Sequence, residues 1–501
     1  MQLAVIDLGS NSFRLVVFTA AGERWRRTDE IYEPVRIGEG LAATGALGEA
    51  PMKRALSTLE VFSHFCKAAG LDGSSVDAVA TSAIRDASNA DAFLARARRR
   101  TGLAIRVLSR EEEAHYGYLA AVNSTTLQDG CVLDLGGGSM QLVQVAGRRA
   151  VTSGSWPMGA VRMTERFLPG DAPATRKQLD KLRAHVTEKL AKAPWLGDCG
   201  ERLVGVGGTV RNLANAAQRA AGLPSIGVQG HCVSPEALDE LVQRLAALPP
   251  ADRAKVAGIK PARADLILAG AVVIQATMAA GGFPALEATE AGLREGVFFA
   301  RHLAESGGLF DDVRRQSVLT LAGQYSADPA HTEHVARLAL GLFDETAAAG
   351  LHPGDPIERE LLWAASALHD IGMSVDYDDH HKHSRYLILN AGLPGFSPTE
   401  LTLIAQATRY HRKGMPDPGP LAPLLQDKAD RARLDRMAAL LRLAEDLERS
   451  RDQSVREAHL RVNGKTATLR LVSDDDTAVP RWAARREVEL FGRAFGRTLV
   501  V

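Results

Sequence analysis

The sequence predicts an α/β protein of two similar lobes facing a cleft, followed by an all-α part and a small α+β tail. Three observations predict this class. Two glycine- and serine-rich loops with the same Asp-Leu-Gly opening, residues 7–12 and 134–139, each follow a short apolar run, which indicates two copies of one supersecondary unit. Strand-like and helical patterns alternate to about residue 305. From about Phe310 the strand patterns vanish, and amphipathic helical segments run to about Arg451.

The first lobe is predicted over residues 1–120. Short apolar runs predict its strands, and longer amphipathic stretches predict its helices. The strands are expected at residues 3–6, 15–19, 76–80 and 105–108, and the helices at residues 52–69 and 89–100.

The second lobe is predicted over residues 121–305 and repeats this scheme. An apolar segment at residues 266–283 contains three glycines and is followed by Pro284, so we interpret it as a buried core helix and not as a membrane span. The strands are expected at residues 131–133, 141–145 and 203–206, the helices at residues 176–192 and 235–247, and a strand and turn into a helix at residues 287–296.

Two further domains are predicted after the lobes. Residues 306–455 are expected to form a helical domain. Residues 456–501 are expected to form a small α+β domain, with strands at residues 459–462 and 466–472 and a helix at residues 486–493.

Composition limits the classes of partner. The chain has 501 residues, and its 60 basic and 60 acidic residues cancel, so no field of the whole molecule attracts nucleic acid or membrane. Any site for a polyanion must therefore be local. The four cysteines are scattered without a C-x-x-C pattern, which indicates reduced thiols in a cytoplasmic protein. The sequence begins directly with a strand pattern, and no secretory signal is expected.

Four motifs recur in order along the chain. They are the loop at residues 7–15, the segment Ala-Thr-Ser-Ala-Ile-Arg-Asp-Ala at residues 80–87, Leu-Ser-Arg-Glu-Glu-Glu-Ala at residues 108–114, and the glycine turn at residues 205–209. Together they resemble the exopolyphosphatase and guanosine pentaphosphate phosphohydrolase (Ppx/GppA) family over nearly the whole chain. The resemblance implies two actin-like, ribonuclease-H-like lobes. It also implies hydrolysis of a terminal phosphoanhydride of inorganic polyphosphate, of guanosine pentaphosphate, or of both.

Charge and resemblance together suggest roles in the main cleft. Glu113 matches the last glutamate of the family's catalytic motif, which implies that it is the general base. Arg85 matches an arginine near the cleft that would neutralise developing charge, although a surface ion pair with Asp86 is the alternative. Asp134, and less directly Asp7, are expected to hold Mg²⁺, because a hard cation prefers oxygen ligands.

Glycine-rich loops let backbone N–H groups point at an anion without interference from a Cβ atom, and hydroxyl and amide side chains add donors. The predicted phosphate-binding residues are Gly9, Ser10, Asn11, Ser12, Gly136, Gly137, Gly138, Ser139, Gly207, Gly208 and Thr209.

One position departs from the family pattern. The family usually has glutamate where this chain has Gln141, and a neutral amide keeps an oxygen acceptor but removes a charge. Whether Gln141 is a metal ligand is therefore left open. A signalling module that binds guanosine tetra- or pentaphosphate with vestigial hydrolysis is one alternative function. An actin-like kinase or ATPase is another, against which stands the glutamate-rich motif that follows Ser109.

A second constellation lies in the helical domain. His331, His369 with Asp370, and Asp446 occur in the order of the HD phosphohydrolase signature, and side chains on separate helices can converge on a metal. Imidazole ligands favour Mn²⁺, Fe²⁺, Co²⁺ or Zn²⁺ over Mg²⁺. His383 and His411 are possible additional ligands, whereas the polar run at residues 380–383 is expected to be an exposed loop.

The helical segment also resembles the C-terminal half of long exopolyphosphatases, which implies a basic passage for polyphosphate and a possible homodimer. The matching basic residues, predicted to bind the polyanion, are Arg409, His411, Arg412 and Lys413.

Overall fold

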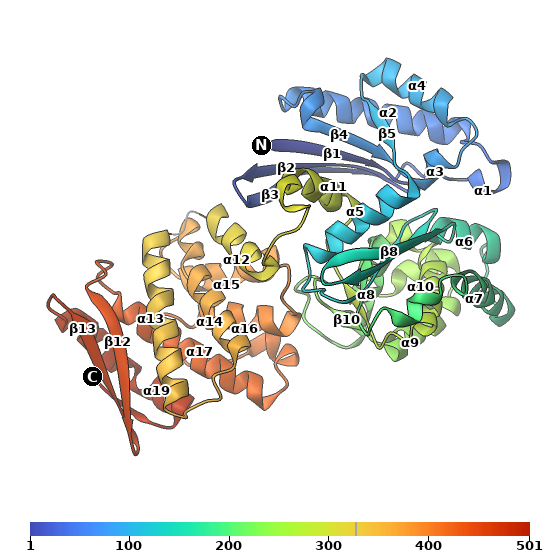
Figure 1. Ribbon diagram of the computed structural model, residues 1–501. Helices are drawn as coiled ribbons and strands as arrows, with labels where there is room; N and C mark the ends of the chain where they lie inside the picture. The colour runs from blue at the N-terminus through green and yellow to red at the C-terminus, as the bar shows by residue number, and fades with distance from the viewer. Residues whose placement is uncertain (326–327) are drawn as a thin grey trace. The chain divides into compact units, whose positions relative to one another are not determined.

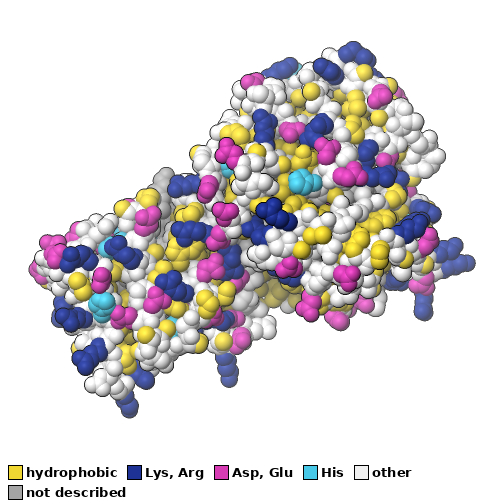
Figure 2. Space-filling model, viewed as in Figure 1, with side chains coloured by type: hydrophobic (Ala, Val, Ile, Leu, Met, Phe, Trp, Pro, Cys, Tyr) yellow, Lys and Arg dark blue, Asp and Glu magenta, His cyan; other side chains and the backbone are white. Residues whose placement is uncertain are grey.

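The computed structural model describes residues 1–325 and 328–501. The chain divides into two compact units, Met1–Val313 and Arg314–Val501, each of which is described by itself (Figure 1). Within the described residues, no helix is long and apolar enough to cross a membrane. On the face shown in Figure 2, basic and acidic side chains are interspersed.

The first lobe contains a five-stranded sheet with the order β3-β2-β1-β4-β5. The first three strands are antiparallel, while β4 runs parallel to β1 and β5 parallel to β4. The strands are β1 (Gln2–Leu8), β2 (Phe13–Ala21), β3 (Arg24–Glu33), β4 (Val76–Ala80) and β5 (Ile105–Val107), and the helices of this part are α1 (Leu41–Thr44), α2 (Glu49–Ala68), α3 (Ser82–Arg85) and α4 (Ala90–Thr101).

The second lobe repeats this topology. Its sheet has the order β10-β11-β9-β6-β7-β8, in which β6, β7 and β8 are antiparallel and β9 and β11 run parallel to β6. The prediction of two similar, ribonuclease-H-like lobes is thus confirmed. The strands are β6 (Gly130–Leu135), β7 (Met140–Ala146), β8 (Arg149–Trp156), β9 (Leu203–Val206), β10 (Cys232–Val233) and β11 (Leu286–Ala288), and the helices are α6 (Ala160–Phe167), α7 (Arg176–Leu190), α8 (Gly208–Ala220), α9 (Pro235–Ala246) and α10 (Ile267–Gly281).

Strand alternation gives the first sheet two apolar faces. Ala4 and Ile6 belong to a core with α2, whereas Leu3 and Val5 belong to a core with α11 (Leu293–His302), which covers the opposite face (Figure 1). The apolar segment at residues 266–283 forms α10, whose side chains are almost all buried in the core of the second lobe. The expected core helix is therefore confirmed.

Two helices pack across the predicted lobe boundary. Helix α5 (Arg110–Val122) lies on the second sheet, whereas α11, which follows the second sheet in sequence, packs on β1 and β2. The ring of Phe298 on α11 stacks on Phe18 with the centroids 4.5 Å apart. The two helices also pack on each other, and a Cβ atom at Gly296 would overlap the backbone of Tyr116. This contact fixes α5, and with it Glu113.

Two edge strands, β3 and β8, were not predicted from the sequence. The sequence of β3 is mostly charged and its side chains are largely exposed, so it shows no apolar alternation. Strand β8 is likewise a mostly exposed or half-buried edge strand.

The C-terminal unit consists of a helical part and a small three-stranded sheet with the order β12-β13-β14. Its predicted strands and last helix are present, and β14 is an additional edge strand. Its elements are α12 (Val313–Gln324), α13 (Pro329–Ala348), α14 (Pro356–Leu368), α15 (His380–Ala391), α16 (Pro398–Arg409), α17 (Lys428–Leu447), β12 (Val455–Asn463), β13 (Thr466–Ser473), α18 (Ala478–Ala484), α19 (Val488–Phe495) and β14 (Thr498–Val500).

The packing of α5 on α11 gives a first prediction. Gly296→Ala places a methyl group against the backbone of Tyr116, which cannot rotate away, so we expect the free energy of unfolding to fall by about 1–3 kcal/mol, the usual cost of overpacking. Thermal unfolding measures the loss. Gly73→Ala is the matched control, because its Cβ atom meets nothing within 4 Å. Equal stability of the two variants would contradict the close packing.

Candidate functional site

Three carboxyl groups gather at the ends of elements in the N-terminal unit. Asp7 lies near the end of β1 and Asp134 near the end of β6, which are equivalent strands of the two lobes, and Glu113 lies in the first turn of α5. Burial, followed by the charges of Glu113 and Asp7, raises the pKa of Asp134 to about 7. Burial also raises the pKa of Asp7 and of Glu113. The three groups therefore share one region, and the protein alone does not balance their negative charge.

A capping box places Glu113. Ser109 accepts a hydrogen bond from the backbone N–H of Glu112, and the Glu112 carboxylate accepts one from the backbone of Ser109, so α5 begins at Arg110. Glu111 is exposed, and Glu112 is half-buried and also pairs with Arg106 at 2.6 Å. These two glutamates therefore stabilise the helix start, as expected, and only Glu113 is buried.

Both oxygens of Glu113 have partners. Arg85 Nη1 donates to Oε2 at 2.8 Å and to the carbonyl oxygen of Leu108 at 3.0 Å, and Ser139 Oγ donates to Oε1 at 3.2 Å. Arg85 lies 3.8 Å from Asp86, so its main ion pair is with Glu113 and not with Asp86.

The two predicted phosphate loops meet each other. The hydroxyl oxygens of Ser10 and Ser82 are 3.1 Å apart, and a Cβ atom at Gly138 would lie 2.5 Å from the Ser82 oxygen. Asn11 is buried, and its Nδ2 finds no hydrogen-bond partner among the described residues. A buried donor of this kind calls for a ligand or water. These loops therefore carry an unused donor at the point where the lobes approach.

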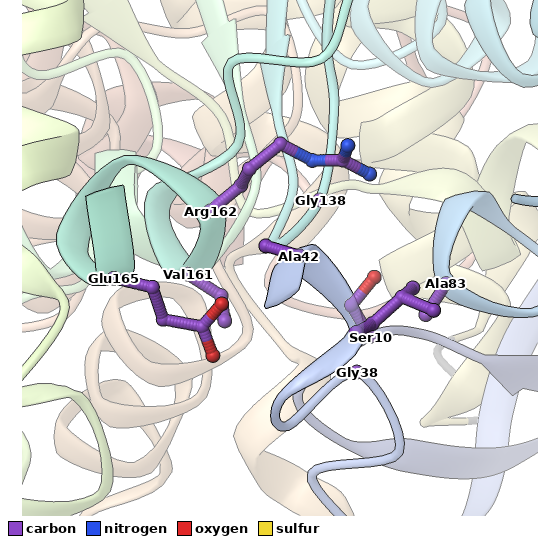
Figure 3. A pocket seen from close by; sticks show the side chains of 9 residues that line it. Ser10, Gly38, Ala42, Ala83, Gly138, Val161, Arg162 and Glu165 are labelled. Atoms are coloured by element: carbon purple, nitrogen blue, oxygen red, sulfur yellow. The ribbon is translucent and has the colours of Figure 1, made fainter. Parts of the chain in front are cut away.

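Figure 3 shows a small pocket beside these loops. Ser10, Gly38 and Ala83 of the first lobe face Gly138 and Arg162 of the second, and the space open to the centre of a water molecule is about 20 Å³. This volume accommodates about one water molecule. The pocket is consequently too small to be the substrate site itself.

The third glycine turn lies beside Asp134. Gly207 has a φ of 106°, and a Cβ atom there would lie 2.9 Å from the carbonyl oxygen of Leu135 and 3.4 Å from Asp134 Oδ1. The buried side chain of Thr209 faces Gly270 of α10, which is packing within the lobe. The turn is near the carboxylates, but the Thr209 side chain points into the core.

Gln141 belongs to the hydrogen-bond network around Glu113. It pairs with Asp134 across β6 and β7, so the two side chains share a face of the sheet. Its Nε2 donates to Ser139 Oγ at 2.9 Å and to Ser155 Oγ at 3.4 Å, and its Oε1 has no hydrogen-bond partner within the described part of the chain. The amide thus supports the serine that contacts Glu113.

Four arginines form a cluster that the sequence reasoning missed. Burial, then the charges of Arg294 and Arg14, lowers the pKa of Arg211 to about 10, and Arg263 contributes as well. Arg14 and Arg294 act on Asp7, and Arg211 acts on Asp134, so the cluster adjoins the carboxylates. Guanidinium groups that destabilise one another favour a polyanionic ligand. They come from four separate segments, which no local pattern connects.

In the main cleft, an oxygen ligand set fits Mg²⁺. Groups of three ligand atoms within 4.8 Å of one another occur, among the residues described, only in the C-terminal unit. Asp7, Asp134 and Glu113 are therefore spaced more widely. Mg²⁺ usually keeps several waters and binds through one or two carboxylates, so this spacing suits it.

The C-terminal unit contains a cluster with metal-ligand geometry. One group of close ligand atoms comprises His331, His369 and Asp370, and a second comprises Asp370, His380 and His411. All five side chains are buried. Despite burial, Asp370 and Glu445 raise the pKa of His369 to about 9. This cluster can hold a metal ion.

Asp446 is not part of this cluster, and that prediction is wrong by one residue. Glu445 Oε2 lies 3.0 Å from His331 Nε2 and 3.2 Å from His369 Nε2. Successive residues of a helix point about 100° apart, so Asp446 points elsewhere on α17. Burial and the charge of Glu487 raise its pKa to about 7.

Two further predictions about histidines are wrong. The run at residues 380–383 is not an exposed loop, because α15 begins at His380, and His380 and His381 are buried. His411 is only 1% exposed and faces the cluster, so it is not a surface ligand for a polyanion.

The basic residues around His411 are more accessible. The guanidinium groups of Arg409 and Arg412 lie over the rings of Tyr410 and Tyr377, and Lys413 Nζ is 3.5 Å from Asp379. Whether they bind a polyanion remains a prediction.

Repeated lobes with glycine loops and half-buried carboxylates at the ends of equivalent strands are typical of enzymes that act on phosphoryl groups. The model of the Ppx/GppA phosphatase family matches residues 26–305, and that of Ppx/GppA phosphatase domain III matches residues 313–483. The chain therefore belongs to the Ppx/GppA phosphatase family. The predicted family and the predicted class, a hydrolase of phosphoanhydrides, are confirmed.

Solved structures agree with this assignment. A Ppx/GppA family member from Aquifex aeolicus is 29% identical, with a TM-score of 0.52, and the match covers 61% of this chain and 98% of that one. An exopolyphosphatase from Cytophaga hutchinsonii is 22% identical, with a TM-score of 0.56 and the same coverage, and it supports the fold. Phosphatases of this family generally depend on a divalent metal.

The pKa of Asp134 gives a prediction for the metal-free protein. A carboxyl whose pKa is about 7 when folded and about 4 when unfolded loses native-state stability as pH rises between those values. In EDTA, Asp134→Asn should therefore be more stable than the unmodified protein by on the order of 2 kcal/mol at pH 8, and the difference should shrink towards pH 4.5. Denaturant unfolding at both pH values measures this. A difference that does not change with pH would contradict the shift.

Proposed function

We propose that the N-terminal unit removes terminal orthophosphate from inorganic polyphosphate, from guanosine pentaphosphate, or from both, with Glu113 as general base. The observation that carries this proposal is the surroundings of Glu113. It is a buried carboxylate of raised pKa, held by Arg85 and Ser139, beside the carboxylates of both lobes.

The base is suited to its task in two respects. Its raised pKa lies closer to the pH at which the enzyme works than that of an ordinary glutamate does. Its two hydrogen bonds fix the carboxylate in one orientation. A water that donates a hydrogen bond to Glu113 passes its proton to the carboxylate as its oxygen attacks the terminal phosphorus. The bond between that phosphorus and the bridging oxygen breaks, and the shortened chain leaves with this oxygen.

The remaining groups stabilise charge. Phosphoryl transfer passes through a loose, highly charged transition state, so positioning and electrostatics matter most. Arg85 would donate to the phosphoryl oxygens through Nε, which has no hydrogen-bond partner among the described residues, while Nη1 still holds Glu113. Asp7 and Asp134 would hold Mg²⁺, which supplies positive charge to the phosphate oxygens when bound. The amides of both loops and Asn11 Nδ2 are the donors for terminal phosphates.

The arginine cluster favours a substrate with several consecutive phosphates. Arg14, Arg211, Arg263 and Arg294 offer more positive charge than one terminal phosphate requires. Inorganic polyphosphate presents such a run of charge, and one similar structure is named an exopolyphosphatase. We expect long chains to be used processively and at least as well as guanosine pentaphosphate.

Side-by-side phosphate release tests the substrate. Purified protein is given long-chain polyphosphate or guanosine pentaphosphate at equal concentrations of terminal phosphate, with Mg²⁺ or Mn²⁺. Release from long chains should equal or exceed release from the nucleotide. Tight binding of guanosine pentaphosphate without turnover would favour the signalling module, and phosphate transfer to an acceptor would favour a kinase.

Replacement of the base gives a sharper test. Glu113→Gln keeps the shape and one acceptor oxygen for Arg85, and its Nε2 can donate to Ser139 Oγ, but the amide cannot take a proton. Turnover should therefore fall by a factor on the order of 10² or more while substrate binding is retained. The control is Glu111→Gln, an exposed neighbour in the same helical turn, which should keep normal turnover. Steady-state kinetics and equilibrium binding separate the two effects. Normal rates in Glu113→Gln would remove it from the mechanism.

A further inference from the structure

We propose that the C-terminal unit holds a dinuclear transition-metal centre, in which Asp370 bridges one ion on His331 and His369 and a second ion on His380 and His411. The two groups of close ligand atoms overlap in one residue, Asp370. A single ion explains one group but leaves the other without a cation. The proposal concerns a site separate from Glu113 and is independent of the proposed function.

The imidazoles are oriented as metal ligands usually are. In three of them Nδ1 donates to the backbone carbonyl three residues earlier: His369 to Ser366 at 2.6 Å, His380 to Tyr377 at 2.8 Å, and His411 to Thr408 at 2.7 Å. Such a bond places a proton on Nδ1, so each Nε2 can present a lone pair to a cation that takes the place of any proton there. The same hydrogen bond at three positions indicates a preorganised set of nitrogen ligands.

The Nε2 atoms of His380 and His411 are only 3.1 Å apart. If both Nδ1 atoms carry the proton, these two lone pairs face and repel each other. Two nitrogens bound to one ion at about 2.1 Å, at angles of about 90–110°, lie about 3.0–3.4 Å apart. Asp370 Oδ1 is 3.3 Å and 3.8 Å from the same two atoms. A cation between them turns the repulsion into coordination.

The other half of the centre has similar spacings. Glu445 Oε2 is 3.0 Å from His331 Nε2 and 3.2 Å from His369 Nε2, which suits two nitrogens and one oxygen on one ion. Asp370 completes this half, with Oδ2 3.8 Å from His331 Nε2 and Oδ1 3.7 Å from His369 Nε2. The two carboxylates balance much of the charge of two divalent ions.

A network of protonated histidines without metal is the alternative. It predicts that the buried polar atoms are satisfied by hydrogen bonds. Yet Asp370 Oδ1 accepts no hydrogen bond, and His331 Nδ1 has no partner, as far as the described residues extend. Asp370 Oδ1 is the atom that faces three of the imidazoles, so the unmet acceptor lies where the ions would sit. Mixed imidazole and carboxylate ligands select Mn²⁺, Fe²⁺, Co²⁺ or Zn²⁺.

The side chains around the two proposed ions indicate which kind of molecule would bind to them. Arg451 Nη2 donates to Asp370 Oδ2 and is partly exposed, and Arg412 lies nearby against Tyr377 and within 3.2 Å of His380 Nδ1. Two divalent ions flanked by guanidinium groups suit an oxyanion such as a phosphate group.

Metal content tests the proposal without reference to phosphate release. The full-length protein is produced with excess Mn²⁺ and then washed with Mg²⁺, which displaces Mn²⁺ from the oxygen ligands Asp7 and Asp134. Elemental analysis should then give two Mn²⁺ per chain. Low-temperature electron paramagnetic resonance should show the exchange-coupled spectrum of a Mn²⁺ pair. One equivalent, none, or an uncoupled spectrum would overturn the dinuclear centre.

Substitutions assign the ions. His411→Ala and His331→Ala should each lose one equivalent, and Asp370→Ala should lose both. His383→Ala is the matched control, because this histidine lies on the same helix as His380 but outside both groups, and it should retain two. If a variant misfolds, the electron paramagnetic resonance spectrum of the unsubstituted protein still tests for a dinuclear centre. Retention of both ions by Asp370→Ala would refute the bridge.

Discussion

Three carboxyl groups and four guanidinium groups meet inside the N-terminal unit, and the behaviour of that region follows from the cost of burying them. An ionised group loses hydration when protein surrounds it, and it regains free energy only through partners. Here burial raises the pKa of Asp134 to about 7 and lowers that of Arg211 to about 10. The cost of burial is therefore not fully offset for the carboxyl groups or for the guanidinium groups. A phosphate chain with a divalent cation, as proposed for the substrate and cofactor, would supply both missing charges.

The repeated topology explains why these charges converge. Equivalent strands β1 and β6 each end near an aspartate, because the two sheets are built in the same order. Helices α5 and α11 then pack on each other and reach across the lobe boundary, which brings Glu113 and Arg294 to the same region. A change in that helix contact should consequently displace Glu113 as well as lower stability.

The features that could be predicted from the sequence are those marked by a local motif. The loops, both aspartates and Glu113 are marked by glycine or capping patterns, and the α/β order follows from periodicity. The arginine cluster was missed because its members come from β2, α8, α11 and the segment before α10, so only tertiary packing unites them. Edge strand β3 was missed because its exposed charged residues hide the strand period. In the helical unit, Glu445 replaces Asp446 because one residue of a helix turns the side chain by about 100°.

The carboxyl groups around Asp7 and Asp134 and the histidine cluster of the C-terminal unit differ in how far they are buried. Asp7 and Asp134 remain partly exposed, so waters and a charged ligand can complete the region around them. In the C-terminal cluster the carboxylates of Asp370 and Glu445 offset positive charge on the imidazoles, and backbone carbonyls hold the rings in place, so His369 and His411 can be almost fully buried. An open set of oxygen ligands suits a site that exchanges its substrate at every turnover. A closed set of mixed nitrogen and oxygen ligands suits ions that stay, and this difference supports the proposal of two independent sites in one chain.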